Sequence, residues 1–410
     1  MKKSSIEIIS IGTELLKGRI VNTNGAEISR TLMMNGFPTS RHTVVSDEPA
    51  QLKAAFIESM KRSQVVITTG GLGPTCDDLT RPIAAALFDS DFYLDETILK
   101  DLQKRYGPNV ISLEDQATQP KNAIILKNDL GTAPGLIFHN EKNTLILMPG
   151  VSKEMRAILQ SQVIPYLLKN FTQEHYDRRH LHFFNLSETL IDPSMRELQR
   201  QFPGIEFGIY PSHGIVSVEA MVRGKNKDLS EQLSEACQSL KTRFIDHYFE
   251  SENGKIEEEI HRIFIENHLT LSLAESCTGG SIASRLTQKA GASAFFLGSL
   301  VCYSNEMKHE ILRVPKDILS QYGAVSEQTV LSMVTGLLKV TQSDFGLAVS
   351  GVAGPTGGTE RTPVGTVWVG VGKKGAKPFA KCLHATGNRE MVIEYTVNCA
   401  LGILRNAVLG

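Results

Sequence analysis

The stretch QVVITTGGLGPTCDDLT (residues 64–80) decides the fold class, because a strand-like run passes directly into a glycine-rich loop. Its first half, rich in Val, Ile and Thr, predicts a strand that is covered on both faces, as strands of parallel sheets are. The earlier run IEIISIG (6–12) has the same character, and helical patterns at 22–34 and 49–61 separate the two runs. This alternation predicts a parallel, doubly wound α/β sheet.

The same alternation continues to about residue 169, with further strand candidates in AIILKN, GLIFHN and TLILMPG and Ser152 as the expected N-cap of the next helix. The polar text KNFTQEHYDRRH (169–180) predicts a linker. We therefore expect two doubly wound α/β domains joined by a small α+β module. The predicted parts are residues 1–169, 170–252 and 253–410, and Ser326 is the expected N-cap of a helix in the third part.

Composition excludes several classes of protein. The 43 basic and 44 acidic residues give a formal net charge of -1, which excludes a globally basic nucleic-acid binder. We find no apolar run of the roughly 18 residues that a membrane span needs, and the N-terminus does not have the pattern of a signal peptide. A cytoplasmic protein is expected. The six cysteines form no CxxC pair, which disfavours a disulfide framework or a structural zinc site.

Two loops of the first domain follow strands, at the sheet edge where open α/β sheets bind ligands. Gly70, Gly71 and Gly73, with Thr75, form a candidate phosphate nest of backbone amides. Acidic side chains beside a phosphate make sense if a divalent metal lies between them. The candidate metal ligands are Glu14, Asp77 and Asp78. The alternative is that the glycines make only a sharp turn and Asp78 caps the following helix.

GTELLKGRIVNTN (12–24) and ITTGGLGPTCDDLT (67–80) resemble the N-terminal domain of the CinA family, which is related to the MogA/MoaB molybdopterin-binding fold. The resemblance implies an ADP-ribose pyrophosphatase that uses a divalent metal, Co²⁺ or Mg²⁺, possibly with K⁺. Cys76 stands where the family often has Lys or another polar residue, which implies a weakened pyrophosphatase if a basic residue there meets phosphate. Asp47 matches an acidic residue of the molybdopterin-binding relatives and is a possible metal ligand; its alternative role is a helix N-terminal acid.

Five motifs in the last 155 residues resemble the complete motif set of the CinA C-terminal domain, the PncC-type deamidase of nicotinamide mononucleotide (NMN). The motifs are LAESCTGG (273–280), CYSNEMK (302–308), YGAVSE (322–327), SGVAGPTGGTERTPVGTV (350–367) and GNRE (387–390). The middle part resembles the KH-like insert of the family. The match therefore spans nearly the whole chain.

Deamidation needs an activated nucleophile, a base and donors aimed at the oxyanion. The residues alone leave several candidates open: Ser276, Cys277, Thr278, Ser293, Tyr303, Ser304 and Lys308. The motifs contain no histidine at their core, which disfavours a Ser-His-Asp triad and favours lysine as base if its pKa is lowered. The resemblance implies Ser293 as nucleophile and Lys308 as its base, with Tyr303 nearby and Ser276 and Ser350 lining the same pocket. We expect Cys277 to point into the core.

Substrate binding is expected at two glycine-rich loops. Thr278, Gly279 and Gly280 precede a helix whose free amides suit an anion, with Ser276 adding a hydrogen bond or capping the helix. Gly351 belongs to the second loop, and Arg389 is a candidate phosphate partner, its alternative being an ordinary exposed arginine. For Ser293, the alternative is a turn or cap serine.

Together these features predict a bifunctional pyridine-nucleotide recycling hydrolase. It would convert NMN to nicotinic acid mononucleotide and ammonia without a cofactor, and would cleave ADP-ribose to AMP and ribose 5-phosphate. NMN and ADP-ribose are the expected partners, and a homodimer is expected by analogy with similar α/β enzymes. The alternative is a molybdopterin-binding protein with an accessory C-terminal domain. We find no GxxG loop between residues 169 and 253, which disfavours nucleic acid, and no membrane partner is expected.

Overall fold

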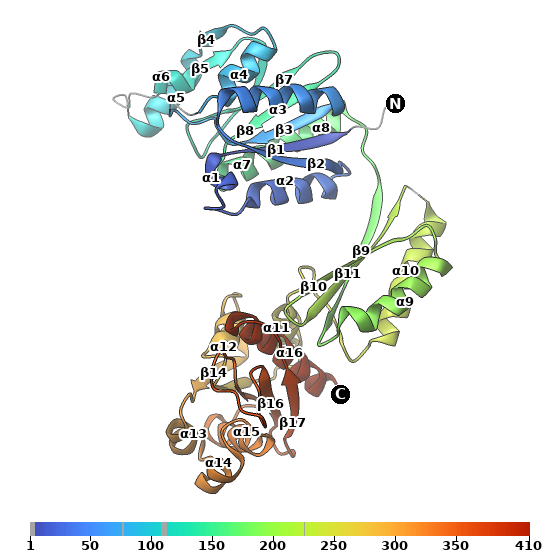
Figure 1. Ribbon diagram of the computed structural model, residues 1–410, viewed down its shortest axis with the longest axis vertical. Helices are drawn as coiled ribbons and strands as arrows, with labels where there is room; N and C mark the ends of the chain where they lie inside the picture. Colours follow the sequence, from blue (N-terminus) through green and yellow to red (C-terminus); the bar gives the residue numbers. More distant parts are fainter. Residues whose placement is uncertain (1–4, 76–77, 108–112, 225) are drawn as a thin grey trace. The chain divides into compact units, whose positions relative to one another are not determined.

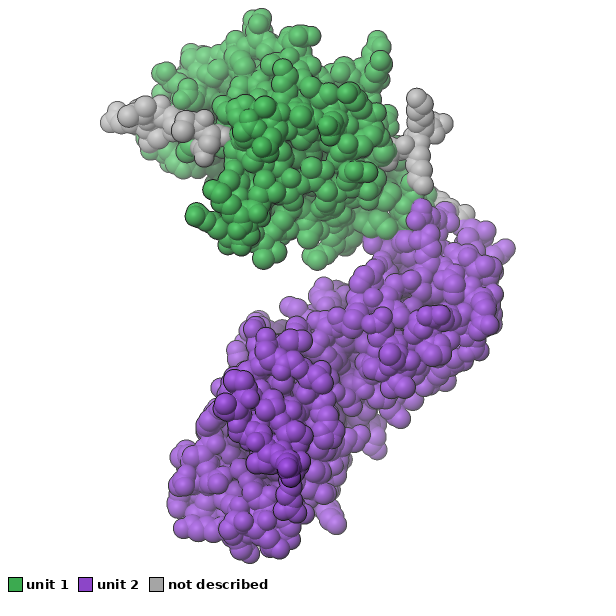
Figure 2. All heavy atoms as spheres, in the orientation of Figure 1, with its two compact units in different colours: residues 1–176 green, residues 177–410 purple. Residues whose placement is uncertain are grey.

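The computed structural model describes residues 5–75, 78–107, 113–224 and 226–410. Contacts between residues divide the chain into two compact units, Met1–Tyr176 and Asp177–Gly410 (Figure 2). Each unit is built on mixed α/β architecture (Figure 1), which confirms the predicted fold class.

The first unit is a six-stranded sheet in the order β2-β1-β3-β8-β7-β6, with helices on both faces. Strands β1, β2, β3 and β8 are parallel, β7 runs antiparallel to β8, and β6 runs antiparallel to β7. Side chains of β1 alternate between two cores: Ile8 packs with Ile28 of α2, and Ile9 packs with Phe56 of α3. The strands are β1 (Ile6–Ile11), β2 (Thr39–Val45), β3 (Val65–Thr69), β6 (Ala123–Leu126), β7 (Gly135–His139) and β8 (Thr144–Met148).

Most predicted helices of this unit are present, with one corrected cap. Helix α7 begins at Ser152 itself, with Val151 at the N-cap position, because the Ser152 hydroxyl donates instead to Asn24 Oδ1 at 2.6 Å. The unit also contains a separate two-stranded sheet of β4 and β5, which the sequence does not predict. The remaining elements are α1 (Thr13–Leu16), α2 (Thr23–Met34), α3 (Pro49–Arg62), α4 (Thr80–Leu87), β4 (Phe92–Leu94), α5 (Glu96–Tyr106), α6 (Leu113–Ala117), β5 (Thr118–Pro120), α7 (Ser152–Ile158), the π-helical turn Leu159–Val163 and α8 (Ile164–Asn170).

The next part, up to residue 249, is a four-stranded sheet in the order β10-β11-β9-β12, which packs on two helices. The predicted linker is wrong from Tyr176 onward, because Tyr176–His180 form the first half of β9. These residues are polar because that half of the strand is only partly buried. The elements are β9 (Tyr176–Phe184), α9 (Glu188–Gln201), β10 (Glu206–Ser212), β11 (Ile215–Arg223), α10 (Lys227–Arg243) and β12 (Tyr248–Phe249).

The C-terminal part is a five-stranded sheet in the order β14-β13-β15-β16-β17. Strands β14, β13 and β15 run parallel to one another, β16 runs antiparallel to β15, and β17 runs antiparallel to β16. The N-cap prediction for Ser326 is confirmed, since its hydroxyl accepts from Thr329 N. The elements are α11 (Ile256–Glu266), β13 (Leu271–Glu275), α12 (Ser281–Thr287), a 3₁₀ turn (Ala292–Ala294), β14 (Phe296–Val301), α13 (Asn305–Leu312), α14 (Lys316–Tyr322), α15 (Glu327–Thr341), β15 (Phe345–Gly351), β16 (Thr366–Lys373), β17 (Phe379–His384) and α16 (Arg389–Leu409).

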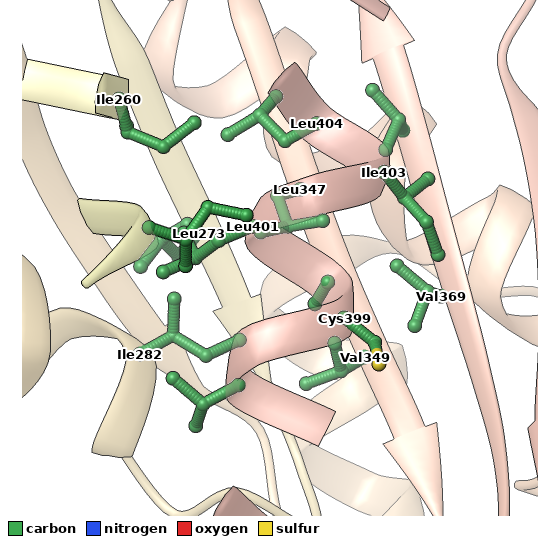
Figure 3. Packing of buried hydrophobic residues seen from close by; sticks show 14 of the residues in the cluster. Ile260, Leu273, Ile282, Leu347, Val349, Val369, Cys399, Leu401, Ile403 and Leu404 are labelled. Carbon is green, nitrogen blue, oxygen red and sulfur yellow. The ribbon is translucent and has the colours of Figure 1, made fainter. Parts of the chain in front are cut away.

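Helix α16 lies against one face of this sheet, with Leu401 and Leu404 packed toward Leu273 and Leu347 (Figure 3). Among the described residues, it is the one helix with the length and composition to cross a membrane, and 56% of its apolar window is buried inside the structure. A core helix of a folded domain has the same length and apolar composition, and α16 packs as such a helix here.

The middle and C-terminal parts share one hydrophobic core. Phe184, Ile215 and Phe249 belong to the same buried cluster as α16. Phe184 lies so close to Gly402 that a Cβ added there would stand 2.1 Å from its ring. This shared core explains why contacts join residues 177–410 into one unit.

Candidate active site

Ser276 and Lys308 meet at the carboxyl edge of the C-terminal sheet. Strand β13 ends at Glu275, directly before Ser276, and its neighbour β14 ends at Val301. Ser304 then caps α13 by accepting from Met307 N at 3.2 Å, which begins the helix so that Lys308 is one turn in. The Lys308 side chain returns over the strand ends, and its Nζ lies 3.0 Å from Ser276 Oγ.

The surroundings of Lys308 favour its neutral form. The residue is 1% exposed, and its Nζ also donates to the carbonyl oxygens of Cys302 at 2.9 Å and Tyr303 at 3.3 Å. Within the described part of the chain, Lys308 forms no ion pair with a carboxylate. Burial lowers the pKa of Lys308 below the usual range of lysine. A neutral amine at this position can accept the proton of the Ser276 hydroxyl.

The structure does not bring Ser293 beside Lys308, so the predicted pair of Ser293 with Lys308 has no contact behind it here and stays a prediction. Ser293 is exposed in the 3₁₀ turn before β14. Strand β14 runs parallel to β13, with Phe296 beside Leu271 and Val301 beside Glu275. Ser293 therefore stands at the amino edge, about 16 Å or more along the strand from the edge that holds Lys308. Ser276, one of the candidate nucleophiles that the sequence leaves open, is the serine that contacts the lysine.

The Glu275 carboxylate occupies amides at the start of α12, so anion binding at Thr278, Gly279 and Gly280 stays a prediction. The Glu275 carboxylate accepts from Gly280 N at 3.1 Å and from Ile282 N and Ala283 N at 3.0 Å. The Thr278 hydroxyl also donates to Glu275, at 2.7 Å. Sequence analysis missed Glu275, although an acid shortly before a helix start is a capping signal.

Cys277 is excluded as a nucleophile at neutral pH. It is buried in the core cluster, as expected from the sequence, and burial raises the pKa of its thiol to about 12. The reactive thiolate is therefore disfavoured.

Arg389 connects two loops at the rim of the same edge. Its Nη1 donates to Gly354 O at 2.9 Å, and its Nη2 donates to the Tyr303 hydroxyl at 3.0 Å. The Tyr303 side chain is 60% exposed. Arg389 is itself exposed and has further N–H groups beyond these two bonds.

Ser350 and Gly351 end β15 beside the loop that holds Ser276, since Val349 pairs with Glu275. The Ser350 hydroxyl is buried and donates to Ala324 O at 2.7 Å, which fixes the loop YGAVSE. At Gly351, an added Cβ would stand 2.5 Å from the Val367 side chain. The contacts of both residues are thus with the protein itself.

In the first unit, the glycines of residues 70–73 allow close packing of the loop. Gly70 and Gly71 have left-handed φ values of 111° and 66°, and an added Cβ would stand 2.3 Å from Ile11 O and 2.1 Å from Thr80 Oγ1, respectively. At Gly73, an added Cβ would stand 2.5 Å from Asp78 Oδ2. These contacts explain the glycines as a sharp turn at the carboxyl edge, and phosphate binding by this loop stays a prediction.

The predicted metal ligands are only partly described. Asp47 Oδ2 accepts from Thr13 N at 2.8 Å, while the next helix, α3, is capped by Glu48. Asp78 Oδ2 accepts from Thr75 N at 3.0 Å and from the Thr75 hydroxyl, so Asp78 does not cap α4, whose N-cap is Leu79. Glu14 is exposed, with its carboxylate folded over Gly12.

Cys76 and Asp77 lie outside the described residues. Among those that are described, no three His, Cys, Asp or Glu side chains are grouped closely enough to hold a metal ion. The metal site therefore stays a prediction.

Comparison with known proteins follows the same division of the chain. Residues 253–408 match the family model of the CinA C-terminal domain, and residues 7–169 match that of the probable molybdopterin binding domain. A CinA-like protein from Dictyoglomus thermophilum is 37% identical over 408 residues, which cover 98% of this chain and 99% of that protein. The chain belongs to the CinA family.

A second relative aligns over the same extent, and solved structures of the family align over part of the chain. A putative competence-damage inducible protein from Clostridium novyi is 36% identical, with 98% of each chain covered. Among solved structures, a competence/damage inducible protein from Agrobacterium tumefaciens is 35% identical and covers 40% of this chain and 98% of its own, with a TM-score of 0.38. CinA from Thermoplasma acidophilum is 36% identical and covers 41% and 97%, with a TM-score of 0.37.

The match to the CinA C-terminal domain spans Ser276, Lys308 and Arg389 together. In this CinA chain, the three residues are far apart in sequence and come from the loop after β13, from α13 and from α16. The fold brings them to one edge of one sheet.

Proposed function

We propose that the C-terminal domain is an amidohydrolase that converts NMN to nicotinic acid mononucleotide and ammonia. The observation that carries this proposal is the 3.0 Å separation of Ser276 Oγ and Lys308 Nζ, with the amine buried and its pKa lowered. This is the arrangement of an activated serine and its base. The choice of NMN rests on the resemblance of the five C-terminal motifs to the PncC-type deamidases.

The reaction uses the two side chains in turn. Ser276 Oγ attacks the carboxamide carbon, and neutral Lys308 accepts the hydroxyl proton. The C–N bond then breaks, and Lys308 returns the proton to the departing ammonia, which leaves an ester on Ser276. Water attacks this ester with Lys308 again as base, the bond from the carbonyl carbon to Ser276 Oγ breaks, and Lys308 returns the proton to Oγ, which releases nicotinic acid mononucleotide. In such dyads, one side chain commonly acts first as general base and then as general acid.

Arg389 and Tyr303 are proposed to bind the nucleotide. The guanidinium is exposed at the rim and suits the phosphate of NMN, since its fork of donors matches phosphate geometry. The exposed Tyr303 ring is a partner for the positively charged pyridinium. Tyr303 is thus assigned to binding rather than to proton transfer.

For the N-terminal domain we propose cleavage of ADP-ribose to AMP and ribose 5-phosphate with Co²⁺ or Mg²⁺, possibly with K⁺. Asp47 and Asp78 each use Oδ2 for hydrogen bonds, which leaves the Oδ1 atoms as hard oxygen ligands. The metal would neutralise charge on the pyrophosphate. The described residues supply no complete ligand set, so no step is assigned to the metal. Molybdopterin binding is the competing function, favoured by the family model matched at residues 7–169.

Both activities are testable on the purified chain. Ammonia release from NMN, measured with and without EDTA, is expected to be metal-independent. AMP formation from ADP-ribose is expected only with added divalent metal. Absence of ammonia release would contradict the deamidase, and tightly bound pterin without AMP formation would replace the pyrophosphatase by the competing function.

A further inference from the structure

Glu275 is a fully buried carboxylate immediately before the proposed nucleophile. It accepts five hydrogen bonds. Oε2 accepts from the Thr278 hydroxyl at 2.7 Å, Gly280 N at 3.1 Å and Ile282 N at 3.0 Å, and Oε1 accepts from Ala283 N and the Ser299 hydroxyl, each at 3.0 Å. Every lone-pair direction of the carboxylate is accounted for by these donors.

The donors come from three different segments. Thr278 and Gly280 belong to the loop that follows Ser276, Ile282 and Ala283 to the first turn of α12, and Ser299 to the neighbouring strand β14. The α12 amides are among those that a helix leaves unpaired, and the helix dipole favours a negative charge there. One carboxylate therefore ties the loop after Ser276 to α12 and to β14.

The direction of the Glu275 side chain also separates its charge from Lys308. Ser276 Oγ contacts the lysine, whereas Glu275 is engaged by α12 and β14. Among the residues that the structure describes, Glu275 forms no ion pair with a lysine or arginine. A carboxylate paired with Lys308 would favour the protonated amine, which cannot act as base.

We propose that Glu275 is a positioning residue that fixes Ser276 against Lys308. This inference rests on the proposed function, because it takes Ser276 as the nucleophile. The acid contacts neither the reacting atoms nor the base. It acts by holding the turn from β13 into α12 in one geometry, while the helix amides and hydroxyls satisfy its charge.

The first test is Glu275→Gln, which keeps the shape and changes the donor pattern. One side of the amide is then an NH₂ group that faces backbone N–H groups, so at least one of the five bonds is lost. We expect kcat for NMN to fall about 100-fold with KM within about threefold, since misplacement of a reacting group costs on this order. Unchanged kcat in the folded variant would overturn the proposal.

A substrate-independent readout separates this proposal from the choice of NMN. A fluorophosphonate probe reacts when Ser276 Oγ bonds to phosphorus, fluoride leaves, and Lys308 takes the proton. We expect labelling of Ser276 by mass spectrometry, abolished in Ser276→Ala and slowed at least tenfold in Glu275→Gln. If NMN is not hydrolysed but this order of labelling holds, the positioning role stands and the substrate is wrong. Absence of Ser276 labelling in the wild type would overturn the positioning role.

Milder variants serve if Glu275→Gln does not fold. Ser299→Ala removes one of the five donors from β14, and we expect labelling to slow several-fold. The matched control is Thr287→Ala on α12, whose exposed hydroxyl donates only to the carbonyls of Ala283 and Ser284. The control should label at the wild-type rate. Equal rates in Ser299→Ala and the control, whether both are slow or both unchanged, would contradict a specific role of the carboxylate.

Discussion

Ser276 Oγ and Lys308 Nζ lie 3.0 Å apart, although 32 positions separate the two residues in the chain. The serine follows β13, and the lysine returns from the first turn of α13. Two carbonyl oxygens hold the amine in place, and no acid pairs with it within the described residues. We propose this pair as the chemical centre of the C-terminal domain.

Lys308→Met removes the amine and retains the length of the side chain. We expect kcat for NMN to fall by about 10²–10⁴-fold, the usual contribution of a positioned base. The melting temperature should not fall much, because burial of a methionine avoids the desolvation of an amine. Steady-state kinetics and calorimetry check the two expectations. More than a tenth of wild-type kcat in this variant would contradict lysine as the base.

The pH dependence of kcat/KM should report the lowered pKa of Lys308. Because only the neutral amine accepts a proton, the rate should rise with pH through an apparent pKa below the 10.5 of an ordinary lysine. In Lys308→Met, the remaining activity should no longer show this rise with pH. A rise that persists in the variant would assign the titration to another group.

Stability of the unit formed by residues 177–410 should fall in mild acid because of His182. Its pKa is lowered from 6.5 to about 4, first by burial and then by nearby His180. Between these values the unfolded chain binds more protons than the folded one, so this contribution is complete above pH 6.5 and is lost as pH falls toward 4. The loss is roughly 2–3 kcal/mol. Urea unfolding of wild type and His182→Gln at pH 7 and 4.5 checks it, and identical pH slopes would refute the assignment.

Arg389→Lys should weaken NMN binding more than it slows turnover. A lysine lacks the planar fork whose two nitrogens donate separately to Gly354 O and the Tyr303 hydroxyl. We expect KM to rise about tenfold, or about 1.4 kcal/mol, with kcat within a few-fold. Tyr303→Phe should raise KM to a smaller extent. A selective loss of kcat in Tyr303→Phe would instead give its hydroxyl a role in proton transfer.

Gly402→Ala should destabilise the core shared by the middle and C-terminal parts. The added methyl would stand 2.1 Å from the Phe184 ring, so the ring or α16 must shift. Overpacking of this kind costs about 1–3 kcal/mol. Thermal unfolding checks the loss. The control is Ala407→Gly, at a partly buried position near the end of the same helix. Helix propensity alone predicts that this change lowers the free energy of unfolding by about 1 kcal/mol.

The sequence predicts the sheet architecture well, because strands such as Ile6–Ile11 and Val65–Thr69 are continuous apolar runs. The polar half of β9 escaped prediction, because a partly buried strand carries no such run. At the site, the helix start at Ser304 and the reach of Lys308 were predictable. The role of Glu275 depends on donors from three segments, which no local pattern displays.

The predicted role of Ser293 rests on the motif resemblance alone. Ser293 precedes a strand and Ser276 follows one, and ligands of open α/β sheets bind at the carboxyl ends of strands. That directional rule alone favours Ser276.

The most direct test compares ammonia release from NMN by Ser276→Ala and Ser293→Ala. Ser293 is an exposed serine at the opposite edge of the same sheet, so it is a matched control. We predict that Ser276→Ala loses at least 10³-fold in kcat, while Ser293→Ala stays within about twofold of the wild type. Full activity in Ser276→Ala with loss in Ser293→Ala would contradict the Ser276–Lys308 dyad.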